Sequence, residues 1–247
     1  MTNTTNPAGR LINILEKFSS QSDPLKIIPA RDAWKDILEI ESDDDSDLFH
    51  AILAVNELVR DTKEVIGRVA TNGELYLRNF DAIEKAVFPG DLDSDFAYTA
   101  KLVNETVLQS LHFCSDLLST YYDEGELTKE ELSHISNMVD ELFETTFNTD
   151  LEPNVKTFIL ESLEAIRRSI NYYKIYGAKG LRSAFQLSLG GIVANQEQLS
   201  STKEKNPAFM KSIASLLSKV DSATAMAFKA QKVLSKALPL LGLDEDK

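Results

Sequence analysis

The segment with the clearest capacity for binding chemistry is the basic stretch 166–182, IRRSINYYKIYGAKGLR. It contains no acidic residue, in a chain with 39 acidic and 26 basic residues. Lysine and arginine near the N-terminus of a helix can hold an anion, since the free backbone N–H groups there add to the positive potential. We predict an anion- or partner-binding site with the candidate residues Arg167, Arg168, Lys174, Tyr176, Lys179 and Arg182. The alternative is internal, with these side chains clamping acidic helices of the same bundle.

A second basic segment is the amphipathic stretch from Pro207 to about residue 238. Residues 207–243 carry a net charge of +4, whereas residues 1–206 carry −15. A basic amphipathic helix can lie on an anionic membrane or on a protein partner. The candidate contact residues for either role are Lys219, Lys229, Lys232 and Lys236. The alternative is a core helix that closes a bundle, because so long an apolar stripe should not be left in water.

Two acidic runs could be taken for metal sites. Residues 41–47, ESDDDSD, hold five acidic residues, and we interpret them as a solvated helix entrance with its N-cap at Ser46. Residues 91–95, DLDSD, place acids at positions 1, 3 and 5 of a calcium-type loop. Phe96 and Leu102 stand where an EF-hand needs glycine and glutamate, so we predict no metal site in either run.

Catalytic signatures are scarce in this chain. Neither a GxSxG nucleophile motif, a Walker A loop nor a GxGxxG fingerprint occurs. His112 and Asp116 are four residues apart, a spacing that predicts a local hydrogen bond rather than a metal site. Cys114 is the single cysteine and lies among apolar residues, which predicts a buried, inert thiol. We therefore expect a non-enzymatic protein without a cofactor.

Helical periodicity dominates the elements that must position these residues. Prolines or caps mark helix starts at Pro7, Pro29, Pro153 and Pro207, and Thr128 with Glu131 forms a capping box. The periodicity predicts single helices over residues 74–87 and 97–121, and a helix from Gly180 to about residue 198 that is interrupted at Gly190–Gly191. No window alternates as a strand would. The pattern predicts an all-α fold, a multi-helix bundle of about nine helices with mostly short connections. Trp34, with Ile37 and Leu38 on its helix, is predicted to anchor the core.

We predict an acidic all-helical body over residues 1–200 and a basic amphipathic C-terminal helix over 206–240 that packs on the same core. A hydrophobic fraction of 43% is sufficient for such a core. Ten glycines and seven prolines are too few for an all-β fold or a typical Rossmann-like fold. The first residues do not follow the pattern of a signal peptide, and a single cysteine fits a reducing compartment, so we expect a cytoplasmic protein.

Three segments resemble stretches of all-helical bacterial proteins of uncharacterised function. They are PARDAWKDIL, HFCSDLLS and ESLEAIRRSINYYKIYGAKGLRSAF, and the resemblance covers about the first 195 residues. It implies an all-α fold and a bacterial origin, and it implies no activity. The basic C-terminal helix lies outside it.

A net charge of −13 disfavours general nucleic-acid binding and suits a basic partner. The leading hypothesis is a non-enzymatic protein-binding module of the bacterial cytosol, and one version is an immunity or antitoxin-like protein that covers a basic toxin. One alternative is a membrane-surface protein acting through the C-terminal helix. The other is a nucleotide- or anion-binding protein using residues 166–182. A bundle with two basic strips can also form a homo-oligomer.

Overall fold

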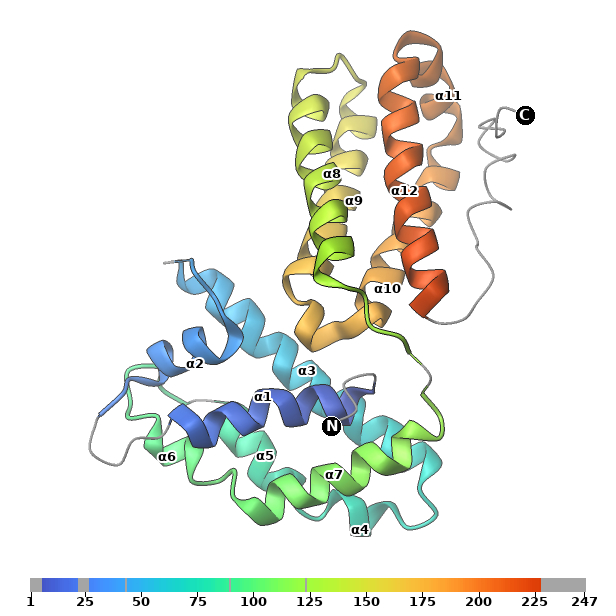
Figure 1. The fold of residues 1–247 in the computed structure, drawn as a ribbon. Helices are drawn as coiled ribbons and strands as arrows, with labels where there is room; N and C mark the ends of the chain where they lie inside the picture. The colour runs from blue at the N-terminus through green and yellow to red at the C-terminus, as the bar shows by residue number, and fades with distance from the viewer. Residues whose placement is uncertain (1–5, 22–26, 43, 89, 123, 228–247) are drawn as a thin grey trace. The chain divides into compact units, whose positions relative to one another are not determined.

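The structure is a computed structural model that describes residues 6–21, 27–42, 44–88, 90–122 and 124–227 (Figure 1). This part of the chain is all-helical, which confirms the predicted fold class. The chain divides into two compact units, Met1–Asp123 and Glu124–Lys247, called here the first and the second unit. The division into a body over 1–200 and a helix over 206–240 stays a prediction, and residues 228–240 lie outside the described part.

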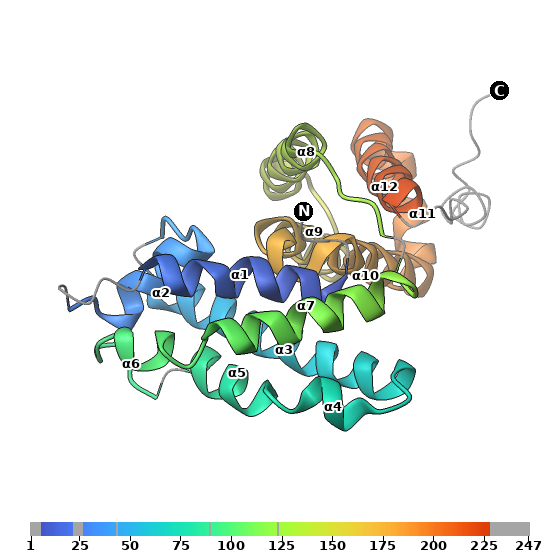
Figure 2. The ribbon, with the colours of Figure 1, turned by 60° about the horizontal axis from the view of Figure 1, so that its bottom comes forward.

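The first unit is assembled around α1, which packs against α2, α3 and α7 (Figure 2). Its core holds Phe18 and the fully buried Trp34, whose rings meet edge to face with centroids 5.0 Å apart. This confirms Trp34 as a core anchor. The helices are α1 (Pro7–Gln21), α2 (Ala30–Leu38), α3 (Asp45–Val69), α4 (Gly73–Leu77), α5 (Phe80–Val87), α6 (Ala97–Ala100) and α7 (Glu105–Ser119).

Side-chain caps set the starts of two of these helices and link them to each other. The buried Asn6 accepts a hydrogen bond from the Gly9 backbone N–H (2.9 Å), an N-terminal cap for α1. Its amide Nδ2 also donates to the backbone oxygen of Ser115 on α7, at 3.1 Å. Asn104 caps α7 by accepting from the Val107 N–H at 3.1 Å. One asparagine therefore starts α1 and ties it to α7.

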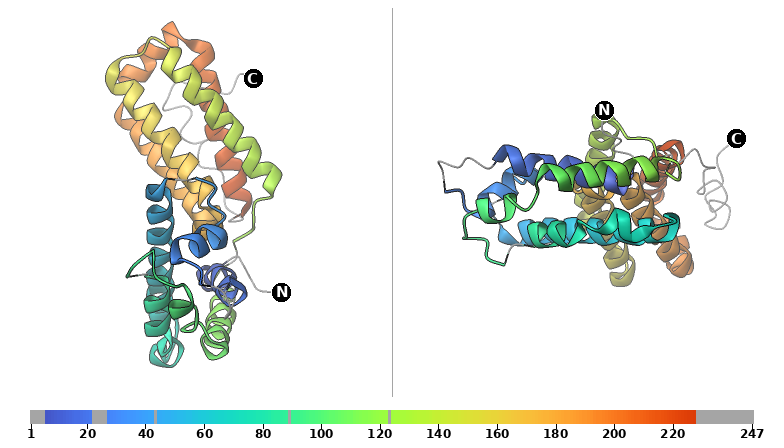
Figure 3. Two further views of the ribbon diagram at one scale, coloured as in Figure 1. Left: turned by 90° about the vertical axis from the view of Figure 1, so that its left-hand side faces the viewer. Right: turned by 90° about the horizontal axis from the view of Figure 1, so that it is seen from below.

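The second unit is a bundle of four long helices with one shorter helix (Figure 3). Helix α9 packs against α8 and α10, and α12 packs against α10 and α8, so that the four enclose one core. The bounds are α8 (Lys129–Asn148), α9 (Pro153–Asn171), α10 (Tyr173–Ala194), α11 (Gln196–Lys205) and α12 (Pro207–Ala227). The predicted capping box is present: the Thr128 N–H donates to Glu131 Oε2 (2.8 Å), and the Glu131 N–H donates to Thr128 Oγ1 (3.1 Å).

Two glycines shape α10 in different ways. Gly177 has φ of 63° and ψ of −163°, a conformation that a Cβ atom disfavours, and it kinks the helix after its first turn. Gly191 faces α9, where a Cβ atom would overlap the ring of Phe158. Neighbouring Gly190 has open space around it. The helix continues through the Gly190–Gly191 pair, so the expected interruption there is wrong.

The described residues form more helices than the nine or so predicted. The span expected to be helical over 74–87 is divided between α4 and α5, and the span over 97–121 is divided between α6 and α7. The span over 180–198 is divided between α10 and α11. In the second case the cause is Asn104, whose side chain starts a new helix in the middle of the predicted one.

Candidate protein-binding surface

The structure brings the two acidic runs of the sequence together at one arginine, Arg31. Its guanidinium donates one hydrogen bond to Asp45 at the start of α3. It donates another to Asp93 in the loop before α6, with 3.2 Å between Arg31 Nη2 and Asp93 Oδ1. Their local neighbours complete a surface, the acidic patch, made of Asp44, Asp45, Asp47, Asp91 and Asp93. Neither the composition nor the spacing of these runs predicted that they would meet.

Backbone pairing holds the loop of the acidic patch beside the start of α2. The Ala30 N–H donates to Ser94 O (2.9 Å), and the Arg31 N–H donates to Leu92 O (2.8 Å). The Phe96 N–H donates to Ile28 O (2.8 Å) on the other side of an isolated bridge between Pro29 and Asp95. Arg31, in the first turn of α2, therefore lies within reach of both acidic runs.

Several carboxylates of the acidic patch have local structural roles. Asp44, not Ser46, is the N-cap of α3, because its Oδ1 accepts from the Ser46 N–H at 2.8 Å. This backbone hydrogen bond lowers the pKa of Asp44 below its usual value. The hydrogen bond from Arg31 lowers the pKa of Asp45 in the same way. Asp91 accepts from the Asp93 N–H (2.9 Å) and shapes the loop. Asp44 and Asp45 thus stay charged at neutral pH.

Two large apolar side chains stand exposed on α3, next to the acidic patch. Phe49 is 52% exposed and Leu53 is 54% exposed, one helical turn apart. The buried stripe of α3 lies on another side and includes Leu48, Ile52 and Val55. Phe49 and Leu53 were not among the site residues predicted from the sequence. The signal was present, because both residues fall outside the apolar stripe at helical spacing.

The acidic patch is not arranged as a cation site. Within the described residues, no group of three or more histidine, cysteine, aspartate or glutamate side chains is placed to hold a metal ion. The carboxylates at 91 and 95 instead accept backbone N–H groups, the latter from Ala97 at 3.1 Å. An acidic surface whose members cap helices and turns offers negative potential to a partner.

The predicted basic site over 166–182 is spread over two helices. Arg167 lies on α9 and pairs with Asp140 of α8 at 2.7 Å, and its guanidinium stacks on the Phe143 ring, 3.9 Å from the centroid. These contacts are of the internal kind that we considered as the alternative. Arg168 is exposed and projects about 100° away from Arg167 around the helix axis. Lys174 and Lys179 are exposed on α10, and Tyr176 and Arg182 are half-buried there.

The apolar stripe of the predicted C-terminal helix is used within the second unit. Phe209, Leu216 and Val220 of α12 are buried in the core that α12 shares with its neighbouring helices. Lys219 is half-buried. Lys229, Lys232 and Lys236 lie outside the described residues. In the described part of the chain, none of the helices combines the length and apolar character that crossing a membrane requires.

Cys114 and His112 lie outside these surfaces and are close to other elements of the first unit. Cys114 is fully buried, its Sγ lies 3.6 Å from Tyr76 O, and desolvation raises its pKa to about 12. This confirms the buried thiol and keeps it protonated at neutral pH. His112 lies with Nε2 3.7 Å from the Glu16 carboxylate on α1, and both side chains are about half exposed.

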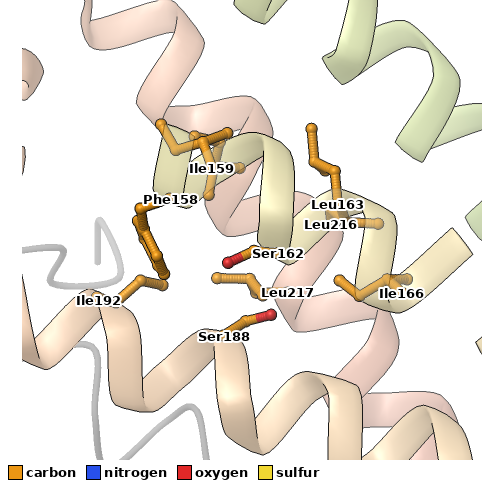
Figure 4. A pocket seen from close by; sticks show the side chains of 10 residues that line it. Phe158, Ile159, Ser162, Leu163, Ile166, Ser188, Ile192, Leu216 and Leu217 are labelled. Carbon is orange, nitrogen blue, oxygen red and sulfur yellow. The ribbon is translucent and has the colours of Figure 1, made fainter. Parts of the chain in front are cut away.

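A small cavity of about 30 Å³ lies between α9, α10 and α12 of the second unit (Figure 4). Ser162 and Ser188 supply its hydroxyl groups, and the Ser188 hydroxyl donates to Ala184 O at 2.9 Å. A space of this size corresponds to about one water molecule. Apolar side chains make up the rest of the lining: Phe158, Ile159, Leu163, Ile166, Ile192, Ile213, Leu216 and Leu217.

Comparisons with known proteins add no relative. No protein-family model, curated protein or solved structure matches the chain.

Proposed function

We propose that this protein is a non-enzymatic binding module of the bacterial cytosol that uses the first unit to engage a basic protein. The observation that carries the proposal is the convergence of two acidic runs at Arg31. A partner with positive surface charge would meet a fixed negative surface there. In the version we favour, the protein acts as an immunity or antitoxin-like protein that covers a basic toxin.

The distribution of charge supports this assignment. The first unit carries 22 acidic and 11 basic residues, a net charge of −11, whereas the second unit carries −2. Complementary charge speeds the encounter of two proteins and suppresses wrong partners. Rim charges act chiefly on the association rate, so the binding should be sensitive to salt.

The test is capture of partners from a lysate of the source organism, using the full chain and two charge-reversal variants. Asp47→Lys with Asp93→Lys changes the acidic patch. Glu141→Lys with Glu144→Lys is the matched control, because both glutamates are exposed on α8 of the second unit and the change in net charge is the same. Circular dichroism verifies that both variants fold.

We expect the wild type and the α8 control to retain one basic protein at low salt. The acidic-patch variant should lose it, and high salt should release it. Equal capture by the two variants, or a retained partner that is itself acidic, would contradict the proposal.

A further inference from the structure

Phe49 and Leu53 form an unusual pair among the exposed apolar residues. Among the described residues, no two of the other large exposed apolar side chains are three or four residues apart. These side chains are Ile27, Leu75, Phe88, Tyr98, Phe113, Tyr121, Phe147, Leu187, Val193 and Met226. Two anchors at i and i+4 present one continuous apolar ridge on a helix. Single exposed apolar residues are ordinary on a protein surface, but a ridge of two beside a charged cluster is the composition of an interface centre.

The residues before and after Phe49 and Leu53 on α3 are held by contacts with the rest of the first unit. Asn56, on the next turn of α3, is directed inward, because its Nδ2 donates to Ile52 O (2.9 Å) and Val87 O (3.3 Å). The N-terminal end of the ridge meets the acidic patch at Asp45, which lies one helical turn before Phe49 on the same face of α3. The ridge therefore has a rigid helix beneath it and negative charge at one end.

We infer that the Phe49–Leu53 ridge of α3 is where the partner seats, and that the partner element is an amphipathic helix with lysine or arginine beside its apolar stripe. This inference rests on the proposed function and adds the anchor and the chemistry of the partner. The charge of the first unit selects a basic element, because an acidic one would be repelled. A helix is favoured over a strand, since the ridge fits the groove between side-chain rows of a second helix.

The apolar anchors and the carboxylates should contribute to binding in different ways. The apolar anchors lose water on binding and hold the complex, so their loss should act on the dissociation rate. The carboxylates remain partly hydrated at the rim, so their loss should act on association and on its salt dependence. The two contributions can be separated by experiment.

The experiment measures binding of a labelled synthetic helical peptide of about 14 leucine and lysine residues to the full chain by fluorescence anisotropy. A scrambled peptide of the same composition tests the need for an amphipathic helix. The anchor variant is Phe49→Ser with Leu53→Ser. Its matched control is Leu187→Ser with Val193→Ser, which removes two comparably exposed apolar residues from α10. A third variant, Asp47→Asn with Asp93→Asn, tests the charges. Thermal melts followed by Trp34 fluorescence and circular dichroism check the fold of each variant.

We expect the anchor variant to bind the amphipathic peptide about tenfold or more weakly, and the α10 control to bind it like the wild type. The Asp47–Asp93 variant should bind with a smaller salt dependence. The scrambled peptide should bind more weakly than the amphipathic one.

The outcomes distinguish this inference from the proposed function. Salt-dependent binding that the anchor variant retains in full would overturn the inference and leave the acidic surface as a docking site. Equal binding of the scrambled peptide would overturn the helical partner. No binding by the wild type at low salt would overturn the inference, while the capture experiment would still decide the proposed function independently.

Discussion

The two units of this protein differ in the helices that build their cores and in their net charge. The first unit builds its core from helices of very different length, from 4 residues in α6 to 25 in α3, and the side chains of Asn6, Asp44 and Asn104 cap three of them. The second unit encloses its core with four long helices and carries little net charge, −2 against −11. The net negative charge is therefore not spread evenly over the chain. Most of the negative charge lies on the first unit, which also holds the acidic patch.

The largest effect should come from the core of the second unit. Leu163 is 3% exposed and lines the small cavity, so Leu163→Ala should lower the free energy of unfolding by about 2–5 kcal/mol. Far-UV circular dichroism during denaturation would measure it. Trp34, the single tryptophan, belongs to the core of the first unit, and its fluorescence midpoint should stay unchanged. Leu187→Ala, at an exposed position, should cost less than about 0.5 kcal/mol. If the Trp34 midpoint moved as far as the dichroism midpoint, the comparison of two separate cores would fail.

The adjacent glycines of α10 offer a sharper test of its packing. Gly191→Ala places a methyl group against the Phe158 ring and should destabilise the second unit by about 1–3 kcal/mol. Gly190→Ala meets no neighbouring atom and should be neutral or stabilising by up to about 1 kcal/mol, since alanine favours the helix. Chemical denaturation of the pair would measure the difference. Equal midpoints would show that α9 and α10 approach less closely than described.

The dependence of the first unit on caps predicts a cost for Asn6→Ala. The variant loses the cap of α1 and the buried hydrogen bonds to Ser115, which should cost about 1–2 kcal/mol. The matched control is Asn72→Ala, because Asn72 stands at the N-cap position of α4 without a capping side-chain hydrogen bond. Denaturation followed by Trp34 fluorescence is the measurement. A cost at Asn72 equal to that at Asn6 would contradict the role of the cap.

The smallest effect concerns acid. The folded structure lowers the pKa of Asp44 through the Ser46 backbone and that of Asp45 through Arg31, from an ordinary value of 3.8. Their contribution to stability is therefore present above about pH 4 and is lost as the pH falls through the lowered values. Thermal melts followed by Trp34 fluorescence should show a smaller loss between pH 7 and acid for Asp45→Asn than for the wild type. An identical acid loss in both proteins would remove Asp45 from the explanation.

Local sequence signals predicted the parts of the fold that depend on local contacts. Pro7 and the Thr128–Glu131 capping box mark helix starts because they act within one turn of chain. The burial of Trp34 and Cys114 followed from their apolar neighbours. The break at Asn104 was also local, but an amide that starts a helix is hard to separate from one that lies within it.

The candidate surface depended on tertiary contacts that periodicity does not carry. Arg31 joins two acidic runs almost fifty residues apart, and only the backbone pairing of residues 28–31 with 92–96 places it between them. Phe49 and Leu53 were visible as apolar residues outside the stripe of α3. Their exposure became a finding only when the neighbouring helices left that side of α3 uncovered.

The central claim is that the first unit binds a basic element at the acidic patch and the Phe49–Leu53 ridge. The most direct test is a map of backbone amide chemical shifts of the full chain, titrated with the amphipathic leucine–lysine peptide. We predict that the perturbed amides fall within residues 44–57 and 91–95. Perturbations centred on the exposed glutamates of α8, with residues 44–57 unchanged, would contradict it.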